Sequence, residues 1–285
     1  MNINKYKVEQ KISLGNIATF EEIDDAKKKL KHIRREISEL QDIMYAHGKY
    51  SMLICLQGMD TSGKDSLVRE VFKDVNARGV VVHSFKKPTS AELKHDFLWR
   101  HYIALPERGK IGVFNRTHYE NVLVTRVHPN YILGEKIPSV TNINVLNDEF
   151  YHKRMQRIVN FEEHIAESGT IVLKFFLHLS KNEQKKRLLR RLNLKAKNWK
   201  FSSDDLKERK LWNSYQECYE DAINNTSKDF APWYIVPADD KATTRLIVAQ
   251  TILQTLQTYK DISEPSLDKE TQANLDEFKK QLEND

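Results

Sequence analysis

Apolar residues along this chain fall into short runs separated by stretches with helical spacing. Five of the runs have the length and composition of buried β-strands, at 51–57, 80–85, 110–114, 170–178 and 233–237. The spacing of apolar residues predicts helices over 63–75, 90–102, 147–168, 181–193, 203–226 and 242–258. Residues 129–146 show neither period and read as an irregular loop. This alternation predicts an α/β fold with a mainly parallel five-stranded sheet.

The N-terminal region predicts one long helix over 19–46. Thr19 and Glu22 have the spacing of a capping box. Apolar residues then recur at alternating spacings of three and four, at Ile23, Ala26, Leu30, Ile33, Ile37, Leu40 and Met44. Such a stripe packs either on its own chain or on a second subunit, and the spacing alone leaves both open.

The basic residues are concentrated in one segment. The chain holds 46 Lys and Arg against 40 Asp and Glu, a net charge of +6. Residues 181–200 hold nine of these basic residues and one acid, a net charge of +8, so the rest of the chain is slightly acidic. The segment indicates either a polyanionic partner or a solvated helix face. Residues 261–285 are acidic instead and predict a loose helical tail.

The composition excludes several classes of protein. Two cysteines, Cys55 and Cys218, are too few for a disulfide scaffold or a multi-cysteine zinc site. The chain has no apolar run of the length that a transmembrane helix needs. Its first ten residues, MNINKYKVEQ, lack the apolar region of a secretion signal, so we expect a cytoplasmic protein.

The strongest local motif is GMDTSGKD at residues 58–65, which fits G-x-x-x-x-G-K between a predicted strand and a predicted helix. In such a loop the backbone N–H groups, the helix N-terminus and Lys64 surround phosphate oxygens. Asp65 and then Ser66 follow the lysine, where Ser or Thr is usual. Asp60 lies inside the loop, where its carboxylate would repel phosphate. We therefore expect Asp60 to hold Mg²⁺ or to orient an attacking phosphate oxygen.

A second polar cluster, NRTHYE at residues 115–120, follows the strand at 110–114. The carboxyl ends of parallel strands meet at one edge of a sheet, so this cluster should converge with the phosphate loop and with Lys86 and Lys87. Asn115 stands where an acid would be the metal-holding partner of the loop. Arg116 can make planar, two-pronged contacts to phosphate. For His118 and Glu120, capping of the next helix is the competing interpretation.

The sequence resembles the polyphosphate kinase 2 family over about residues 50–240. The matching stretches are GMDTSGKDS (58–66), FKKPTSAEL (85–93), FNRTHYENVLVTRVHP (114–129), LKFFLHLSKNEQKKRL (173–188), NWKFSSDDLKERKLWNSYQECYEDAI (198–223) and APWYIVPAD (231–239). The resemblance implies a P-loop kinase-like three-layer fold with a helical lid. Together with the N-terminal stripe and the acidic tail, this predicts an N-terminal helical extension at 1–48, a P-loop kinase domain at 49–260 with a lid at about 181–210, and an acidic tail at 261–285.

The resemblance also implies which residues act. Asp60, Lys64, Asn115 and Arg116 take the catalytic positions, and Asp60 and Glu120 are the candidate ligands of Mg²⁺, with Mn²⁺ as an alternative ion. The implied substrate-binding residues are Gly58, Thr61, Ser62, Gly63, Asp65, Ser66, Arg69, Lys86, Lys87, His118, Glu120, Arg126, Arg187, Arg191 and Lys200. Family members often carry Ser at the position of Thr117 and Asp at that of Asn121, so a metal-binding role for a carboxylate at 121 is absent.

The resemblance implies Mg²⁺-dependent, reversible transfer of a phosphoryl group from inorganic polyphosphate to a nucleotide. Members with Asn at position 115, in an F-N-R-x-H-Y-E context, resemble enzymes that accept AMP and often ADP, and those with Asp resemble ADP-phosphorylating enzymes. We therefore expect AMP or ADP as acceptor, with GMP and GDP as further candidates. We expect a homo-oligomer of two or four subunits and neither a nucleic-acid nor a membrane partner.

Three alternatives remain open at this stage. An ATP-dependent nucleotide kinase would share the loop, the sheet and the lid. A nucleic-acid-binding P-loop protein would use the basic segment and bind DNA or RNA in a salt-dependent way. A scaffold that binds phosphate without chemistry would be favoured by loss of the loop lysine, but Lys64 is present.

Overall fold

The computed structural model describes residues 1–198 and 201–285. Its sheet has five strands in the order β2-β3-β1-β4-β5, and every pairing is parallel, which confirms the predicted sheet. The strands are β1 (Ser51–Gln57), β2 (Val80–Ser84), β3 (Ile111–Asn115), β4 (Thr170–His178) and β5 (Trp233–Pro237). The strand order changes direction at the central strand β1, the place where α/β proteins form ligand crevices.

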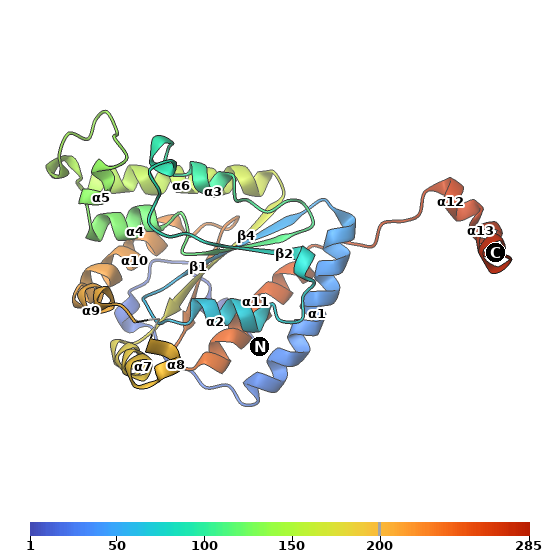
Figure 1. Cartoon of the computed structure of the whole chain (residues 1–285), viewed down its shortest axis with the longest axis horizontal. Coiled ribbons are helices and arrows are strands. Elements are labelled where there is room, and N and C mark those ends of the chain that lie inside the picture. Colours follow the sequence, from blue (N-terminus) through green and yellow to red (C-terminus); the bar gives the residue numbers. More distant parts are fainter. Residues whose placement is uncertain (199–200) are drawn as a thin grey trace.

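Helices cover both faces of the sheet (Figure 1). One face carries α1 (Ala26–His47), α2 (Lys64–Val71) and α11 (Lys241–Thr258). The other carries α4 (Glu120–Val127), α6 (Asp148–Glu167) and α10 (Trp212–Thr226), with the short helices α3 (Trp99–Tyr102) and α5 (Asn130–Leu133) nearby. The result is the three-layer arrangement that strand–helix alternation predicts.

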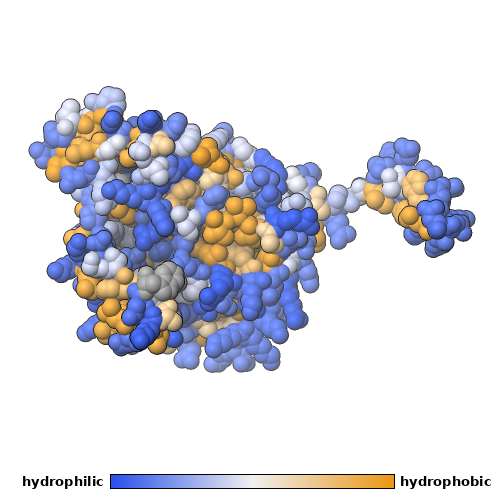
Figure 2. All heavy atoms as spheres, viewed as in Figure 1, coloured by the Kyte–Doolittle hydropathy of each residue, from blue (hydrophilic) through white to orange (hydrophobic). Residues whose placement is uncertain are grey.

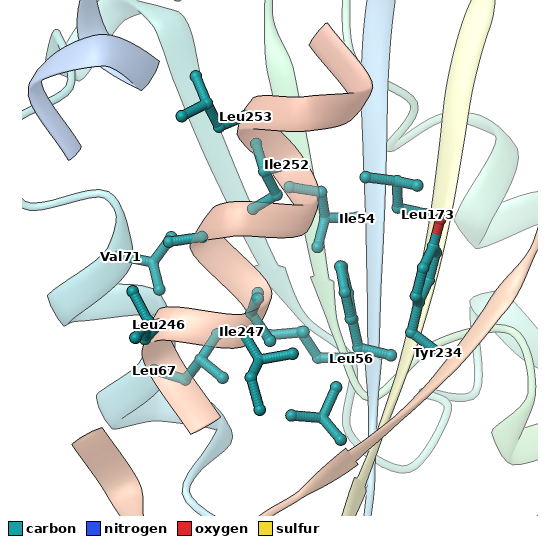
Figure 3. Close-up of a cluster of buried hydrophobic side chains, with 14 of the residues drawn as sticks. Ile54, Leu56, Leu67, Val71, Leu173, Tyr234, Leu246, Ile247, Ile252 and Leu253 are labelled. Carbon is teal, nitrogen blue, oxygen red and sulfur yellow. The ribbon is translucent and has the colours of Figure 1, made fainter. Parts of the chain in front are cut away.

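The core on the α11 face holds the strand that carries the phosphate loop. Alternate residues of β1 point to this face, and Ile54 and Leu56 are fully buried there. Figure 3 shows how α11 and α2 pack on the strands through Leu246, Ile247, Ile252, Leu253, Leu67 and Val71. Full burial of one large aliphatic side chain contributes about 1.5–3 kcal/mol to stability. The loop after β1 therefore begins from a rigid base.

The segment predicted as a lid contains α7 (Lys181–Asn193), α8 (Lys195–Asn198) and α9 (Ser203–Lys210) and is called the lid below (Figure 1). The C-terminal tail forms α12 (Lys269–Ala273) and α13 (Leu275–Glu283), which project from the body in Figure 1. Figure 2 shows apolar atoms on the surface of this tail, where Leu282 is 76% exposed. None of the helices among the described residues has both the length and the apolar character needed to cross a bilayer.

The N-terminal arm differs from its prediction. Helix α1 begins at Ala26, not at residue 19, and Thr19 caps no helix. Thr19 instead donates from Oγ1 to Asp239 and accepts from the Asp239 N–H at its backbone oxygen, so its polar groups are used for a long-range contact. The apolar stripe of α1 packs on α11 of the same chain. N-terminal to α1, the Val8 N–H donates to Trp233 O. This hydrogen bond places the N-terminal residues beside the edge strand β5.

Two other predicted helices are interrupted. The region 90–102 contains only a 3-10 turn at Glu92–Lys94 and α3, because the Asp96 carboxylate accepts from the Leu98 N–H and forms a local turn that competes with a helix. The helix predicted over 203–226 breaks at Leu211 into α9 and α10. Helix α9 buries none of its residues and α10 buries many, so the two helices pack on different surfaces.

Candidate functional site

A cavity of about 700 Å³ lies at the carboxyl ends of β1, β2 and β3. Its walls come from the phosphate loop, the segment after β2, the turn between β3 and α4, helices α4 and α5, the lid helices α7 and α9, and the start of α10. The sequence predicted that the first three would converge, and they do. Ligands of open α/β sheets bind at this edge.

The phosphate loop has a backbone that only certain residues can adopt. Gly58 has φ +149°, and a Cβ there would lie 2.9 Å from Leu177 O and from Ser62 Oγ. Gly63 also has positive φ, and Thr61 adopts φ 67°, an uncommon value for a residue with a side chain. Helix α2 begins directly at Lys64, so its first N–H groups face the loop.

The side chain of Lys64 is held in place by contacts with the phosphate loop. Its Nζ donates to Gly58 O at 2.6 Å and lies 3.4 Å from Met59 O and from Ser62 Oγ. Burial, together with the charge of Arg116, lowers the pKa of Lys64 to about 8, and the carboxylate of Asp60 opposes both effects. A bound phosphate would stabilise the ammonium, because a nearby negative charge favours the charged form of lysine.

Arg116 bridges the loop and α4. Its guanidinium donates to Asp60 Oδ1 at 2.8 Å and lies 3.7 Å from Glu120 Oε2. The carboxylate of Glu120 raises the pKa of Arg116, burial opposes that effect, and Asp60 adds to it. Asp60 therefore lines the cavity and contacts Arg116, with 28% of its side chain exposed.

Asn115 and Asp65 form a hydrogen-bonded pair beside the phosphate loop. Asn115 Nδ2 donates to Asp65 Oδ1 at 2.6 Å, and Ser84 Oγ lies 3.4 Å from the same amide. Asn115 Oδ1 is buried and has no hydrogen-bond partner among the described residues. The carboxylate of the pair thus lies on the first turn of α2, and the neutral amide ends the strand.

Several predicted residues lie outside the cavity wall. His118 is fully buried below the site and contacts Glu162. Arg126 pairs with Asp148 and Asp221, and Arg69 is exposed beside Glu70. The structure therefore does not bring these three side chains to the phosphate loop.

Arg187 of the lid supports the phosphate loop from behind. Its guanidinium donates to the carbonyl oxygens of Thr61, Ser62, Ala238 and Asp239, and it is buried. Gln184 on the same helix donates to Asp60 O at 3.1 Å. Arg191 pairs with Asp205 of α9 at 3.3 Å. The predicted lid residue Lys200 lies outside the described residues.

Helices α9 and α10 contribute cavity residues that the sequence did not indicate. Their side chains are Asp204, Asp205, Glu208, Arg209, Tyr215 and Tyr219. Burial raises the pKa of Asp205, the Ser202 N–H opposes this, and Asp60 raises it further, so Asp205 lies near the loop carboxylate. The S-S-D-D run at 202–205 signals a helix start, and Ser202 does form a capping box with Asp205. Nothing in the local sequence shows that this helix start faces a cavity.

The segment after β2 brings further cations to the wall. Lys86 and Lys87 line the cavity, and Arg100 donates to Lys86 O at 2.8 Å. Lys87 Nζ lies 4.8 Å from the ring centroid of Tyr131, which adds an aromatic surface to the cavity wall. Arg100 was missed because its helical turn carries no motif.

Cation ligands are sparse among the described residues. No group of three or more His, Cys, Asp or Glu side chains is arranged there to hold a metal ion. Asp60 and Glu120, the predicted ligands, both flank Arg116. Any metal at this site must therefore take most of its ligands from water or from a bound phosphate.

Known proteins resemble this chain over most of its length. A "Polyphosphate kinase 2" family model matches residues 21–264. An "ADP-polyphosphate phosphotransferase" of Rhodopseudomonas palustris is 48% identical over 224 residues, which cover 79% of this chain and 76% of that protein. An "AMP/ADP-polyphosphate phosphotransferase" of Meiothermus ruber is 42% identical over 225 residues, 79% of each chain.

The fold agrees with these matches. The crystal structure of polyphosphate kinase 2 from Arthrobacter aurescens superposes with a TM-score of 0.84 at 34% identity, over 93% of this chain and 91% of that one. The family model, the relatives and the structure point to the same group of proteins, as the motifs had. The chain belongs to the polyphosphate kinase 2 family.

Proposed function

We propose that this chain catalyses reversible, Mg²⁺-dependent transfer of a phosphoryl group from inorganic polyphosphate to AMP or ADP. The observation that carries the proposal is the cavity in which Lys64 and Arg116 face the carboxylates of Asp60 and Glu120. Lys86 and Lys87 extend its positive wall. The names of the relatives, which specify ADP in one case and AMP and ADP in another, support the same reaction.

The transfer needs little covalent work from the protein. A terminal phosphate oxygen of the nucleotide attacks the terminal phosphorus of polyphosphate and forms a new P–O bond. The anhydride bond to the next phosphorus breaks, and its electron pair leaves with the shortened polyphosphate. Both bonds are phosphoanhydrides when the acceptor is a nucleotide phosphate, so the reaction is reversible. Catalysis then rests on positioning and on neutralisation of charge.

Each site residue has a role in this scheme. Lys64 and the N–H groups at the start of α2 hold the phosphoryl group that is transferred, because they form one positive surface. Arg116 holds the acceptor phosphate and keeps it in line with the donor. Asp205 and Glu208 of α9 close the cavity from the lid side and limit access of water.

The donor set fits Mg²⁺. This ion keeps several waters and binds one or two carboxylates together with substrate phosphates. Asp60 and Glu120 are two carboxylates at the cavity wall, and the described residues offer no larger cluster. When bound, Mg²⁺ would neutralise charge on the phosphate oxygens. Asp60 and Glu120 would hold it, and Arg116 would move from them to the acceptor.

The lid supplies charge for a long anion. Residues 181–200 carry a net charge of +8, and polyphosphate is charged along its whole length. Lys185, Lys186 and Arg190 are exposed on α7. We propose that this surface guides the polyphosphate chain toward the loop, because opposite charge raises the local concentration of a ligand.

Asn115 is proposed to permit AMP as acceptor. A carboxylate at this position would meet Asp65 at the distance of the present 2.6 Å hydrogen bond. The pair would add negative charge beside the loop and disfavour a nucleotide phosphate bound deep in the cavity. The neutral amide avoids this repulsion.

One assay tests the proposal. Purified protein with Mg²⁺ and long-chain polyphosphate is given AMP, ADP, GMP or GDP, and all nucleotide products are separated by anion-exchange chromatography. We expect ADP and ATP from the adenine nucleotides, and the guanine nucleotides report on base preference. Reactions without polyphosphate should form no product. Phosphorylation of AMP by ATP in the absence of polyphosphate would instead indicate an ATP-dependent nucleotide kinase and overturn the proposal.

A further inference from the structure

Arg116 has a backbone conformation that its neighbours must enforce. Its φ is +60°, in the left-handed region that residues with a Cβ seldom adopt. Such a conformation persists where the surroundings over-determine it. Asn115 before it is paired within the sheet, and the Arg116 N–H lies 3.3 Å from Leu56 O. The constraint on the other side must come from the residues that follow.

The three residues after Arg116 are fully buried, and each has a polar anchor. Thr117 Oγ1 accepts from Gln57 Nε2 at 3.2 Å and from the Tyr119 N–H at 3.1 Å. His118 Nε2 lies 2.9 Å from Glu162 Oε1, and the Tyr119 hydroxyl accepts from Lys174 Nζ at 2.8 Å. Helix α4 begins at the next residue, so the turn has no free segment in which to relax.

Two of these anchors end in one buried ion pair. Lys174 Nζ lies 2.5 Å from Glu162 Oε2, and both side chains have 0% exposure. Glu162 belongs to α6 and Lys174 to β4, and neither lines the cavity. Lys174 also donates to Thr226 O at 2.8 Å, which completes its hydrogen bonds. Glu162 thus links His118 and Lys174, and Lys174 links Glu162 and Tyr119.

A buried ion pair is seldom needed for stability alone, because well-packed apolar residues serve as well or better. The contacts of this pair with His118 and Tyr119 indicate a second role. We propose that Glu162 and Lys174 are positioning residues, which fix His118 and Tyr119 and through them hold the backbone turn that directs the Arg116 side chain into the cavity. This inference rests on the proposed function, because Arg116 is taken to hold the acceptor phosphate.

A purely structural role makes a different prediction. If the pair only supports the junction of α6, β4 and α10, its loss lowers stability, and the molecules that remain folded keep their kinetic constants. If it positions Arg116, folded molecules lose kcat/KM for the nucleotide, and they lose nothing further once Arg116 is gone. Coupling of this kind is what a double-mutant cycle measures.

The experiment is a cycle of Glu162→Gln and Arg116→Ala, assayed with polyphosphate and AMP or ADP below the unfolding temperature of every variant. We expect Glu162→Gln to lower kcat/KM for the nucleotide by about tenfold to a hundredfold, because small misplacements of a positioned group have effects of that size. The KM for polyphosphate should change little. In the Arg116→Ala background the same change should have almost no effect. Glu163→Gln, an exposed neighbour on α6, is the matched control.

A milder variant guards against loss of folding. Tyr119→Phe removes only the hydroxyl that accepts from Lys174 and keeps both charges. It should reduce kcat/KM several-fold and again only when Arg116 is present. Wild-type constants in folded Glu162→Gln and Tyr119→Phe, or effects that multiply independently of Arg116, would overturn the inference. A wild-type protein without polyphosphate-dependent transfer would overturn the proposed function instead.

Discussion

The floor of the cavity and the lid helix α9 are built in opposite ways. The floor holds two of the four non-glycine residues with positive φ among the described residues, Thr61 and Arg116, and buried polar contacts fix both segments. The lid helix α9 buries none of its residues, and its ion pair to α7, between Asp205 and Arg191, is partly exposed. Regions with few buried contacts open most easily. The difference predicts a preformed floor and a helix α9 that opens more easily than the floor does.

The largest expected effect comes from the floor. Asp60→Asn removes the loop carboxylate that faces Arg116 and is proposed to bind Mg²⁺. We expect kcat to fall by about two to three orders of magnitude, the range found when a charge-stabilising group is removed from an active site. Circular dichroism and the unfolding midpoint should stay near those of the wild type. The exposed Asp42→Asn is the control, and a near-normal kcat would remove Asp60 from its role.

The next effect concerns the contact between lid and floor. Arg187→Leu leaves four backbone carbonyl oxygens without their donor. We expect the free energy of unfolding to fall by about 3 kcal/mol, because buried groups lose charge-assisted hydrogen bonds. Urea denaturation measures this, with the exposed Arg190→Leu as the matched control. Equal stability of the two variants would mean that Arg187 does not join the two regions.

A substitution at the strand end should shift acceptor choice. Asn115→Asp places a second carboxylate against Asp65. We expect the ratio of kcat/KM for AMP to that for ADP to fall by about tenfold, which corresponds to about 1.4 kcal/mol. The measurement uses both nucleotides in parallel at fixed polyphosphate. An unchanged ratio would contradict the role given to Asn115.

The pH dependence should move activity and stability in opposite directions. Burial, with the charge of Arg116, lowers the pKa of Lys64 from 10.5 to about 8. As pH rises through 8 the free enzyme loses this ammonium, so kcat/KM for polyphosphate should decline by about tenfold per pH unit. Between pH 8 and 10.5 the unfolded chain binds more protons at this site, so its contribution to stability rises with pH.

Lys64→Met separates this contribution from other titrations. The difference in unfolding free energy between wild type and Lys64→Met should change by roughly 3 kcal/mol across that window, since each pKa unit is worth about 1.4 kcal/mol. A difference that stays constant with pH would show that Lys64 titrates as an ordinary exposed lysine.

The smallest effect belongs to the outer lid. Lys185→Gln with Lys186→Gln removes two exposed cations from α7. We expect the KM for polyphosphate to rise by about two- to threefold at low salt and the difference to vanish at high salt, because exposed charges are screened. The KM for the nucleotide should not change. A salt-independent effect on both substrates would place these lysines inside the site.

Motifs in the local sequence predicted those parts of the site that are formed by consecutive residues or by the ends of parallel strands. The loop at 58–65 needs glycine, a lysine and a helix start in sequence order, and parallel strand ends brought Arg116 and Lys86 to it without further information. The Glu162–Lys174 pair carries no such signal, because its partners come from separate elements and meet only through tertiary packing. The same applies to Asp205, whose spacing is equally typical of an ordinary exposed helix start.

Long-range contacts also explain the errors. Thr19 has the spacing of a helix N-cap residue, but its hydroxyl donates to Asp239, which lies far along the chain, and so it caps no helix. His118 stands in a motif with Arg116, yet its ring points to Glu162 because the chain enters the core directly after Arg116. A single sequence shows which residues are neighbours along the chain and not which face of a turn each will take.

The N-terminal residues and the C-terminal helices differ in how closely they pack on the body of the protein. Ile3, Tyr6 and Val8 are buried, and the Val8 N–H is tied to β5, so the first residues are part of the packed body. Helices α12 and α13 stand clear of that body in Figure 1. A fluorescent label on α12 or α13 should therefore leave the packed body unchanged, whereas one at Tyr6 or Val8 would displace buried contacts next to β5.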